Sequence, residues 1–197
     1  MNRIRTYLPH AIALVASLVF LDSLRFKFTN AVETQVIFGK LNAWASSLGA
    51  PGLFAPTGLF SQYVIGSAEL VASALLLVGI HPALRRFQAV GALVAFAVMS
   101  GAVNFHLWTP LGIDPNNDGG GLFFMACTVW VTSIVLIVIR RRELAAIGQG
   151  LAATFLPGRG ADAEPQFRRR RYTQPHRSAP RATQNLPPRN SGSAKFV

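Results

Sequence analysis

The segment from Gln62 to Ile80, QYVIGSAELVASALLLVGI, constrains the fold most, because Glu69 is the only charged residue in it. A charge this deep in an apolar segment costs about 2.5 kcal/mol or more in a membrane, so such residues usually face a protein interior or a wet cavity. Polar and small residues recur at helical spacing on one face of the segment, at Gln62, Gly66, Glu69 and Ser73. This face is predicted to pack inward.

Three further apolar segments give the chain the composition of a small membrane protein. Of its 197 residues, 51% are hydrophobic and only 14% are charged, which is too few charges for an ordinary soluble domain. A helix needs about 20 residues to cross a bilayer, and the predicted spans cover about residues 5–24, 62–80, 87–108 and 121–139. The expected fold class is therefore all-α, an integral membrane four-helix bundle.

Local patterns outside the Glu69 segment predict further features of the bundle. Apolar residues between the first two spans recur at spacings of four, three and four, which predicts a short amphipathic helix over about residues 31–48, lying at the membrane interface. Asn30 and Glu33 resemble the residue pair that caps such a helix. In the third span, Ala97 and Gly101 are spaced for close packing against another helix.

The net charge of +11 is concentrated in the C-terminal segment. Residues 157–197 hold nine Lys and Arg residues against two acidic ones, a net +7. The segment is rich in Arg, Pro, Gln, Ser and Gly and poor in apolar residues, which predicts a disordered basic tail behind a transmembrane domain at residues 1–156. A basic run at Arg168 to Arg171 beside a membrane domain favours membrane lipid with anionic headgroups, and no nucleic acid, as its partner.

Basic residues also predict the orientation of the spans, because cytoplasmic flanks carry excess Lys and Arg. In a chain that crosses four times, three basic groups fall on one side: Arg3 with Arg5, Arg85 with Arg86, and Arg140 to Arg142. Both termini are therefore expected to lie in the cytoplasm.

With this orientation, the other notable polar residues fall in the outer half of the bundle. Glu69 lies seven residues, roughly 10 Å, from the outer end of its span. Further pocket candidates at this depth are Arg25, Lys27, Asn104, His106 and Asp118. Asn104 and His106 are about 200 degrees apart around an ideal helix, so only one of them can face Glu69. The set predicts either an outward pocket in which Glu69 is a proton or hydrogen-bond partner, or an internal clamp that pairs Glu69 with Asn104, Arg25 or a backbone group.

Metal and disulfide chemistry find little support in the sequence. Asp114, Asn116 and Asp118 begin a calcium-loop pattern, but Met125 stands where that pattern needs a glutamate. A polar turn whose Asp118 caps the fourth span is favoured, and cation binding there stays open. No metal site is predicted inside the spans, because no His, Cys or carboxylate pair has ligand spacing there. Cys127 is the single cysteine, which excludes an internal disulfide.

Three motifs in the sequence resemble the DoxX family of small four-helix bacterial membrane proteins. They are LRFKFTN after the first span, GSAELVASALLLVG in the second, and LGIDPNNDGGGLFF at the entry to the fourth. The resemblance covers about residues 8–140 and implies a multi-pass protein of the bacterial inner (plasma) membrane. The site residues that it implies are Arg25 or Lys27, Glu69, and Asp118 with Gly119.

Members of this family are linked to quinone-coupled oxidation of thiosulfate or to oxidative-stress assemblies. The resemblance therefore implies a redox-associated membrane subunit that contacts a quinone and works with soluble or membrane redox proteins. The sequence contains no complete active site and no redox centre, so a quinone or a partner would have to supply electron transfer. Two alternatives stay open: a small-solute or proton-coupled transporter, and a scaffold that anchors soluble enzymes. Homo-oligomerisation is open as well.

Overall fold

The computed structural model describes residues 3–155, and every regular element in that range is helical. The elements are α1 (Arg3–Phe28), α2 (Val32–Ser47), α3 (Gln62–Val78), the short 3₁₀ helix η1 (Pro82–Leu84), α4 (Arg85–Trp108), α5 (Gly121–Ile139) and α6 (Arg141–Phe155). The predicted all-α fold is thus confirmed for the described part of the chain. The predicted basic tail, residues 157–197, lies outside the described residues.

Within residues 3–155, three helical segments are long and apolar enough to cross a membrane. They are Thr6–Phe28, Pro82–Trp108 and Gly121–Ile139. α3 is also apolar, but it has only 17 residues and is shorter than the other three. These lengths and compositions are compatible with membrane insertion.

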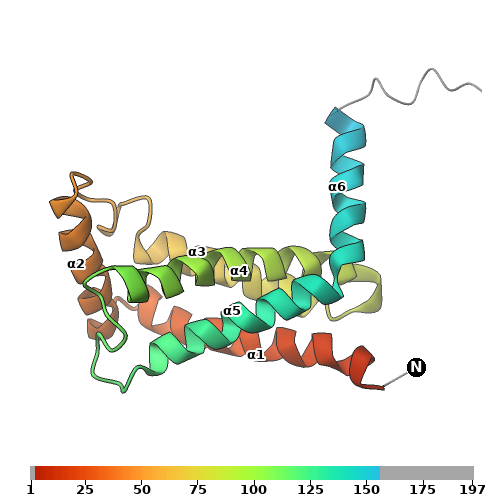
Figure 1. Ribbon diagram of the computed structural model, residues 1–197, viewed down its shortest axis with the longest axis horizontal. Coiled ribbons are helices and arrows are strands. Elements are labelled where there is room, and N and C mark those ends of the chain that lie inside the picture. The colour runs from red at the N-terminus through yellow and green to blue at the C-terminus, as the bar shows by residue number, and fades with distance from the viewer. Residues whose placement is uncertain (1–2, 156–197) are drawn as a thin grey trace, which may run out of the picture. The chain divides into compact units, whose positions relative to one another are not determined.

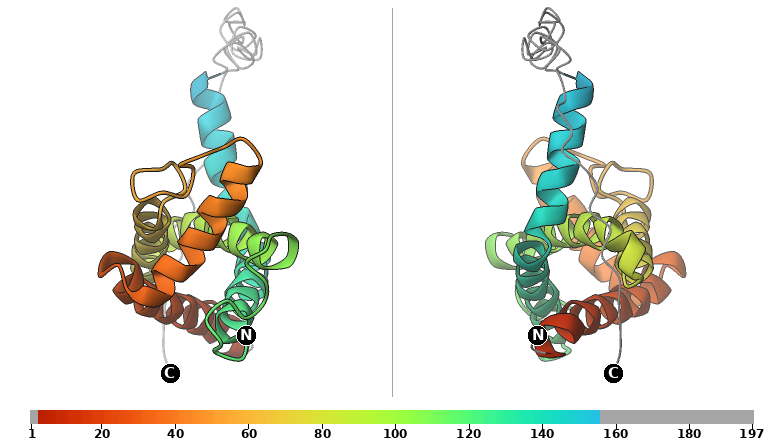
Figure 2. Two further views of the ribbon diagram at one scale, coloured as in Figure 1. Left: turned by 90° about the vertical axis from the view of Figure 1, so that its left-hand side faces the viewer. Right: turned by 90° about the vertical axis from the view of Figure 1, so that its right-hand side faces the viewer.

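Four helices, α1, α3, α4 and α5, run side by side (Figure 1), and we call them the packed helices. Their main contacts join α3 to α4, α1 to α3, and α4 to α5. α2 crosses the end at which α1 finishes and α3 begins, as the left view of Figure 2 shows. α6 starts at the opposite end and runs across the direction of α5 instead of continuing it. We refer to these as the α2 end and the α6 end.

Small residues bring α3 and α4 into close contact, but they are not the predicted ones. A Cβ atom added at Gly91 would lie 2.9 Å from the backbone nitrogen of Leu76, so the two backbones approach too closely there for a larger residue. Ala97 is exposed, and a Cβ at Gly101 would contact only a side chain of its own helix. The prediction for Ala97 and Gly101 is wrong because that face of α4 points away from its neighbours.

α1 continues about four residues beyond its predicted end near residue 24 and finishes at Phe28. No glycine or proline interrupts the sequence there, and the first residue with a left-handed backbone is Asn30, with a φ of 52°. The extension places Lys27 in the last turn of α1 and not in a loop. The side chain of Lys27 is therefore held by a regular helix.

The helix predicted over residues 31–48 is present as α2, but its predicted cap is wrong. The residue that precedes the helix in the capping position is Ala31, and no side chain caps α2 there. Asn30 instead accepts a hydrogen bond from the Gln62 side chain at 2.8 Å. The side chain of Asn30, which the sequence pattern predicted to cap α2, thus bonds to α3 instead.

Candidate functional site

The polar face predicted on α3 packs against α1, and its inward direction is confirmed. Gln62, Gly66, Glu69 and Ser73 are all buried. Glu69 is only 2% exposed although it carries a carboxylate. Gly66 sits close to the last turns of α1, since a Cβ there would lie 3.5 Å from the Lys27 side chain. This face of α3 is the candidate site.

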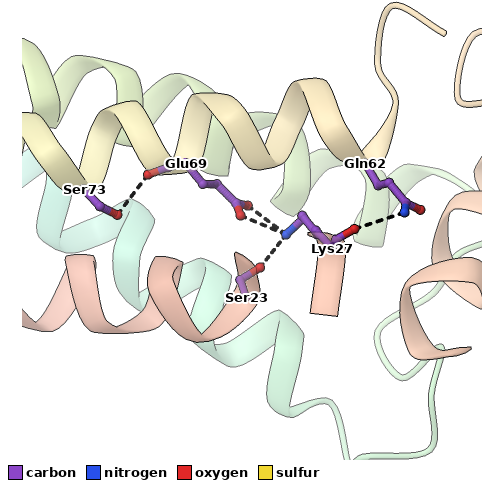
Figure 3. A network of polar contacts seen from close by, with 5 residues as sticks. All are labelled: Ser23, Lys27, Gln62, Glu69 and Ser73. Carbon is purple, nitrogen blue, oxygen red and sulfur yellow. Dashed lines mark hydrogen bonds and ion pairs between the residues drawn. The ribbon is translucent and has the colours of Figure 1, made fainter. Parts of the chain in front are cut away.

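Glu69 is paired with Lys27 across the contact between α3 and α1 (Figure 3). The Lys27 Nζ donates to Oε2 of Glu69 at 2.9 Å and to Oε1 at 3.0 Å. It also donates to the hydroxyl of Ser23, one turn earlier on α1. The three hydrogens of the ammonium group therefore have three acceptors. The pair is electrically neutral as a unit.

Two further side chains extend this network along α3 without touching the carboxylate. The Ser73 hydroxyl donates to the backbone carbonyl of Glu69 at 2.9 Å. At the α2 end, the Gln62 amide donates to the Lys27 carbonyl at 3.1 Å and to the Asn30 side chain at 2.8 Å. Gln62 thereby holds the backbone that positions Lys27.

The two sides of the ion pair differ in their access to the surroundings. The side chain of Lys27 is 15% exposed and that of Glu69 is 3% exposed. Burying both charges has a desolvation cost that their attraction must offset, whereas removing one partner of such a pair typically costs about 3–5 kcal/mol. The accessible part of the pair therefore belongs to Lys27, whose Nζ atom donates to Ser23 and to both carboxylate oxygens.

Arg25 and Asn104, the predicted clamp partners of Glu69, do not contact it. Arg25 is exposed and pairs with Asp22 on its own helix at 3.3 Å. Asn104 is exposed too, and its amide donates to a backbone carbonyl one turn earlier in α4 at 2.7 Å. Of the two basic candidates on α1, the structure brings Lys27 to Glu69, because Lys27 lies on the face of α1 that packs against α3.

His106 likewise serves a local contact away from Glu69. Its Nδ1 lies 2.6 Å from the carbonyl oxygen of Gly112, and the ring packs edge-on against Phe123 with 5.6 Å between centroids. These contacts hold the turn after α4 against the start of α5. The sequence allowed one of Asn104 and His106 to share a pocket with Glu69, and the structure brings neither to it.

Asp118 and Gly119 belong to a tight turn before α5. The Asp114 carboxylate accepts from the backbone of Asp118 at 2.7 Å and of Gly119 at 3.2 Å, where Gly119 has a φ of 70°. The Asp118 carboxylate accepts from Gly120 at 3.0 Å and from Leu122 at 3.1 Å, so it binds a free N–H of the first turn of α5 as predicted, although Gly120 and not Asp118 occupies the capping position. Desolvation raises the pKa of the Asp118 carboxyl, but the hydrogen bonds that it accepts from the backbone of Leu122 and Gly120 lower this pKa by more, so the net shift is downward.

Sequence reasoning missed two members of the network around Glu69. Ser23 lies four residues before Lys27, a spacing that puts both side chains on one face of a helix and would have revealed the contact had α1 been extended. Asn30 follows α1, and its sequence context indicated only a cap for α2, not a bond to Gln62. Neither residue could be placed without knowing where α1 ends.

A second buried polar cluster, at the α6 end, was also missed. Gln88 is fully buried, accepts from the Nε of Arg140 at 2.7 Å, and donates to the carbonyl of Pro9 at 3.4 Å. Arg140 is only 6% exposed, and its guanidinium lies 3.6 Å from the Glu143 carboxylate. The Nδ1 atom of His10 is buried without a hydrogen-bond partner among the described residues. The sequence feature that could have indicated this cluster is Gln88, a single amide at the start of the apolar run of α4.

Comparison of the chain with protein-family models, with curated proteins and with solved structures found no match. The family resemblance therefore depends on the three sequence motifs alone. Two of these motifs meet in the structure, because Lys27 of LRFKFTN is bonded to Glu69 of GSAELVASALLLVG. Within residues 3–155, no group of three His, Cys, Asp or Glu side chains is placed to hold a metal ion.

Proposed function

We propose that the protein is a four-span protein of the bacterial inner membrane, with α1, α3, α4 and α5 as the spans. At 1.5 Å per residue α3 is about 26 Å long, close to the roughly 30 Å of a hydrocarbon core. Arg85, Arg86, Arg141 and Arg142 all lie at the α6 end. By the positive-inside rule this end faces the cytoplasm, and α2 lies at the outer interface. A C-terminal reporter active only in the periplasm would contradict this orientation.

Within that membrane the protein acts as a redox-associated subunit of DoxX type that contacts a quinone. The observation that carries the proposal is the Lys27–Glu69 ion pair, with a 2.9 Å bond and a nearly inaccessible carboxylate. Well-packed apolar residues in place of a buried ion pair are often neutral or stabilising, so packing α1 against α3 does not require these charges. Intramembrane ionisable residues usually mark ligand or proton sites.

The chemistry of the pair suits a ligand whose carbonyl oxygens accept hydrogen bonds and protons. Reduction of a quinone to a quinol takes up two electrons and two protons. Lys27 would donate to a quinone carbonyl oxygen in place of the Ser23 hydroxyl, and Glu69 would hold a proton next to it. The electrons would come from a partner protein, because the sequence offers no redox centre.

Quinone titration of the full chain in lipid nanodiscs tests this role. A short-chain quinone is the probe, and the variants are Glu69→Gln and the double variant Lys27→Met with Glu69→Leu, which removes both charges together. We expect each to weaken quinone binding at least about tenfold, equivalent to about 1.4 kcal/mol. Arg25→Gln is the matched control and should bind as the wild type does. Wild-type affinity in the double variant would remove the ion pair from the function.

The alternatives from the sequence give different results in related assays. Proton or solute flux in quinone-free proteoliposomes, abolished by Glu69→Gln, would favour a transporter. Soluble enzymes that co-purify with the full chain, but not after deletion of residues 157–197, would favour a scaffold. The two outcomes are distinguishable because they depend on different parts of the chain.

A further inference from the structure

α6 has two chemically different faces, and its outer half has no partner among the residues that the structure describes. On helical spacing, Leu144, Ile147, Leu151 and Phe155 share one face. Gln149 and Arg142 lie on the opposite face and are exposed. Leu151 is 55% exposed and Phe155 is 78% exposed, so the apolar face is uncovered along the last turns.

The direction of the apolar face follows from its first residues. Leu144 and Ile147 are half-buried where α6 meets α4 and α5, whereas Arg141 and Arg142 are exposed. The apolar face is therefore turned toward the packed helices. α6 runs across the direction of α5, and its C-terminal part extends beyond the packed helices (Figure 1). The exposure of Leu151 and Phe155 agrees with an apolar face that continues past these helices.

Connectivity fixes the level at which this helix begins. A single residue, Arg140, separates the candidate span α5 from α6. Arg140 is held in place by its bond to Gln88 on α4. If α5 crosses a membrane, α6 starts at the membrane surface and runs along it, with its apolar face toward the hydrocarbon.

We propose that α6 is an in-plane membrane helix, whose face of Leu144, Ile147, Leu151 and Phe155 is covered by a lipid surface with anionic headgroups. Helices of this kind bury the apolar face at the boundary of headgroups and acyl chains, and basic residues strengthen binding to anionic lipid. Arg141 and Arg142 begin the helix, and the nine basic residues of the sequence after residue 156 follow it. This charge pattern favours anionic lipid over a second copy of the chain, which would carry the same positive charge. The proposal rests on the membrane placement given above.

Spin labels on the two faces of α6 test this proposal in the full chain. Single cysteines replace Leu151 and Gln149 in a Cys127→Ala background, in nanodiscs that hold one copy each, and collision with oxygen and with a water-soluble nickel chelate is measured. We expect the label at position 151 to collide at least about threefold less with nickel than the label at 149, and more with oxygen. This difference should grow when anionic lipid replaces part of a zwitterionic disc. Arg141→Gln with Arg142→Gln should reduce that dependence on anionic lipid, because the nine basic residues after residue 156 still remain.

The outcomes that overturn the proposal are distinct from failure of the membrane placement. Equal nickel collision at positions 151 and 149 would show that α6 does not lie on lipid. Protection of position 151 only in discs with two copies would assign the face to a second chain and overturn the lipid proposal. A third label replaces the exposed Ala97 near the middle of α4. If that label also collides freely with nickel, the membrane placement itself is wrong, and the α6 proposal is overturned with it.

Discussion

The two ends of the packed helices bury a positive charge in different ways. At the α2 end, Lys27 donates to both oxygens of Glu69 and to Ser23, so a full negative charge faces the ammonium. At the α6 end, Arg140 donates through Nε to the neutral amide of Gln88, and Glu143 is 3.6 Å away at its nearest. The first charge is neutralised by a close partner and the second only in part.

This difference follows from the burial of the two acids and not from that of the two cations. Glu69 lies two turns inside α3 and its side chain is 3% exposed, whereas the side chain of Glu143 on α6 is 24% exposed. Glu69 therefore needs a close cation to offset its desolvation, whereas Glu143 remains partly solvated at a longer distance from Arg140. The comparison therefore predicts a larger penalty for losing a partner at the α2 end.

The largest effect is expected from separating the ion pair. Glu69→Leu leaves the Lys27 ammonium facing an apolar side chain, and such a loss costs about 3–5 kcal/mol. Lys27→Met should be costly for the same reason, whereas the double variant Lys27→Met with Glu69→Leu should come within about 1 kcal/mol of the wild type. Reversible unfolding in mixed detergent micelles measures these free energies. A double variant as unstable as the singles would mean that the charges are required for packing.

A smaller effect is expected at the α6 end. Gln88→Leu removes the acceptor of the Arg140 Nε, and an unsatisfied buried donor costs about 1–3 kcal/mol. The same unfolding assay applies, with Gln149→Leu on the exposed face of α6 as the matched control. If Gln88→Leu proved more costly than Lys27→Met, the proposed order of the two ends would be reversed.

Residues within one helix were the part of this architecture that could be predicted. The spacing of Gln62, Gly66, Glu69 and Ser73 fixes their common face whatever surrounds α3, and their burial follows from the apolar character of the segment. The bounds of α3, α4 and α5 were similarly clear, because polar or glycine-rich turns flank long apolar runs. Local periodicity carries this information without any knowledge of neighbouring helices.

Relations between helices could not be predicted in the same way. Depth placed Asn104 and Lys27 equally near Glu69, but only packing decides which face of each helix points inward. Ala97 and Gly101 failed for this reason, since their spacing is suited to a helix contact that α4 makes elsewhere. Depth along a bundle can thus be predicted from sequence more reliably than rotation about a helix axis.

Asp118 provides a test outside the packed helices and away from both buried clusters. Asp118→Ala removes the acceptor for the first-turn N–H of Leu122 and should cost about 1 kcal/mol, as for other lost caps. Because the folded pKa of Asp118 lies below its ordinary value of 3.8, its contribution is fully present above that value and is lost as the pH falls through the folded pKa. The difference in stability between wild type and Asp118→Ala should therefore shrink as the pH falls below 3.8, which unfolding curves from about pH 2.5 to 7 would check. A constant difference over this range would contradict the role of the charged carboxylate.

The smallest effect is expected at Arg25, which sharpens the comparison because it lies two residues from Lys27 on the same helix. Its side chain is 69% exposed, and its partner Asp22 is 66% exposed, so the ion pair is well solvated. Exposed pairs contribute little, and Arg25→Gln should change the free energy of unfolding by less than about 0.5 kcal/mol. The matched substitution Lys27→Gln leaves the deeply buried Glu69 carboxylate without its cation and should cost several times more. Both changes in the free energy of unfolding are measured in one assay. Because Arg25 and Lys27 carry the same charge and lie two residues apart on α1, the ratio of these changes reports the effect of the helix face alone. Equal losses would mean that the face of α1 turned toward α3 confers no special environment on Lys27.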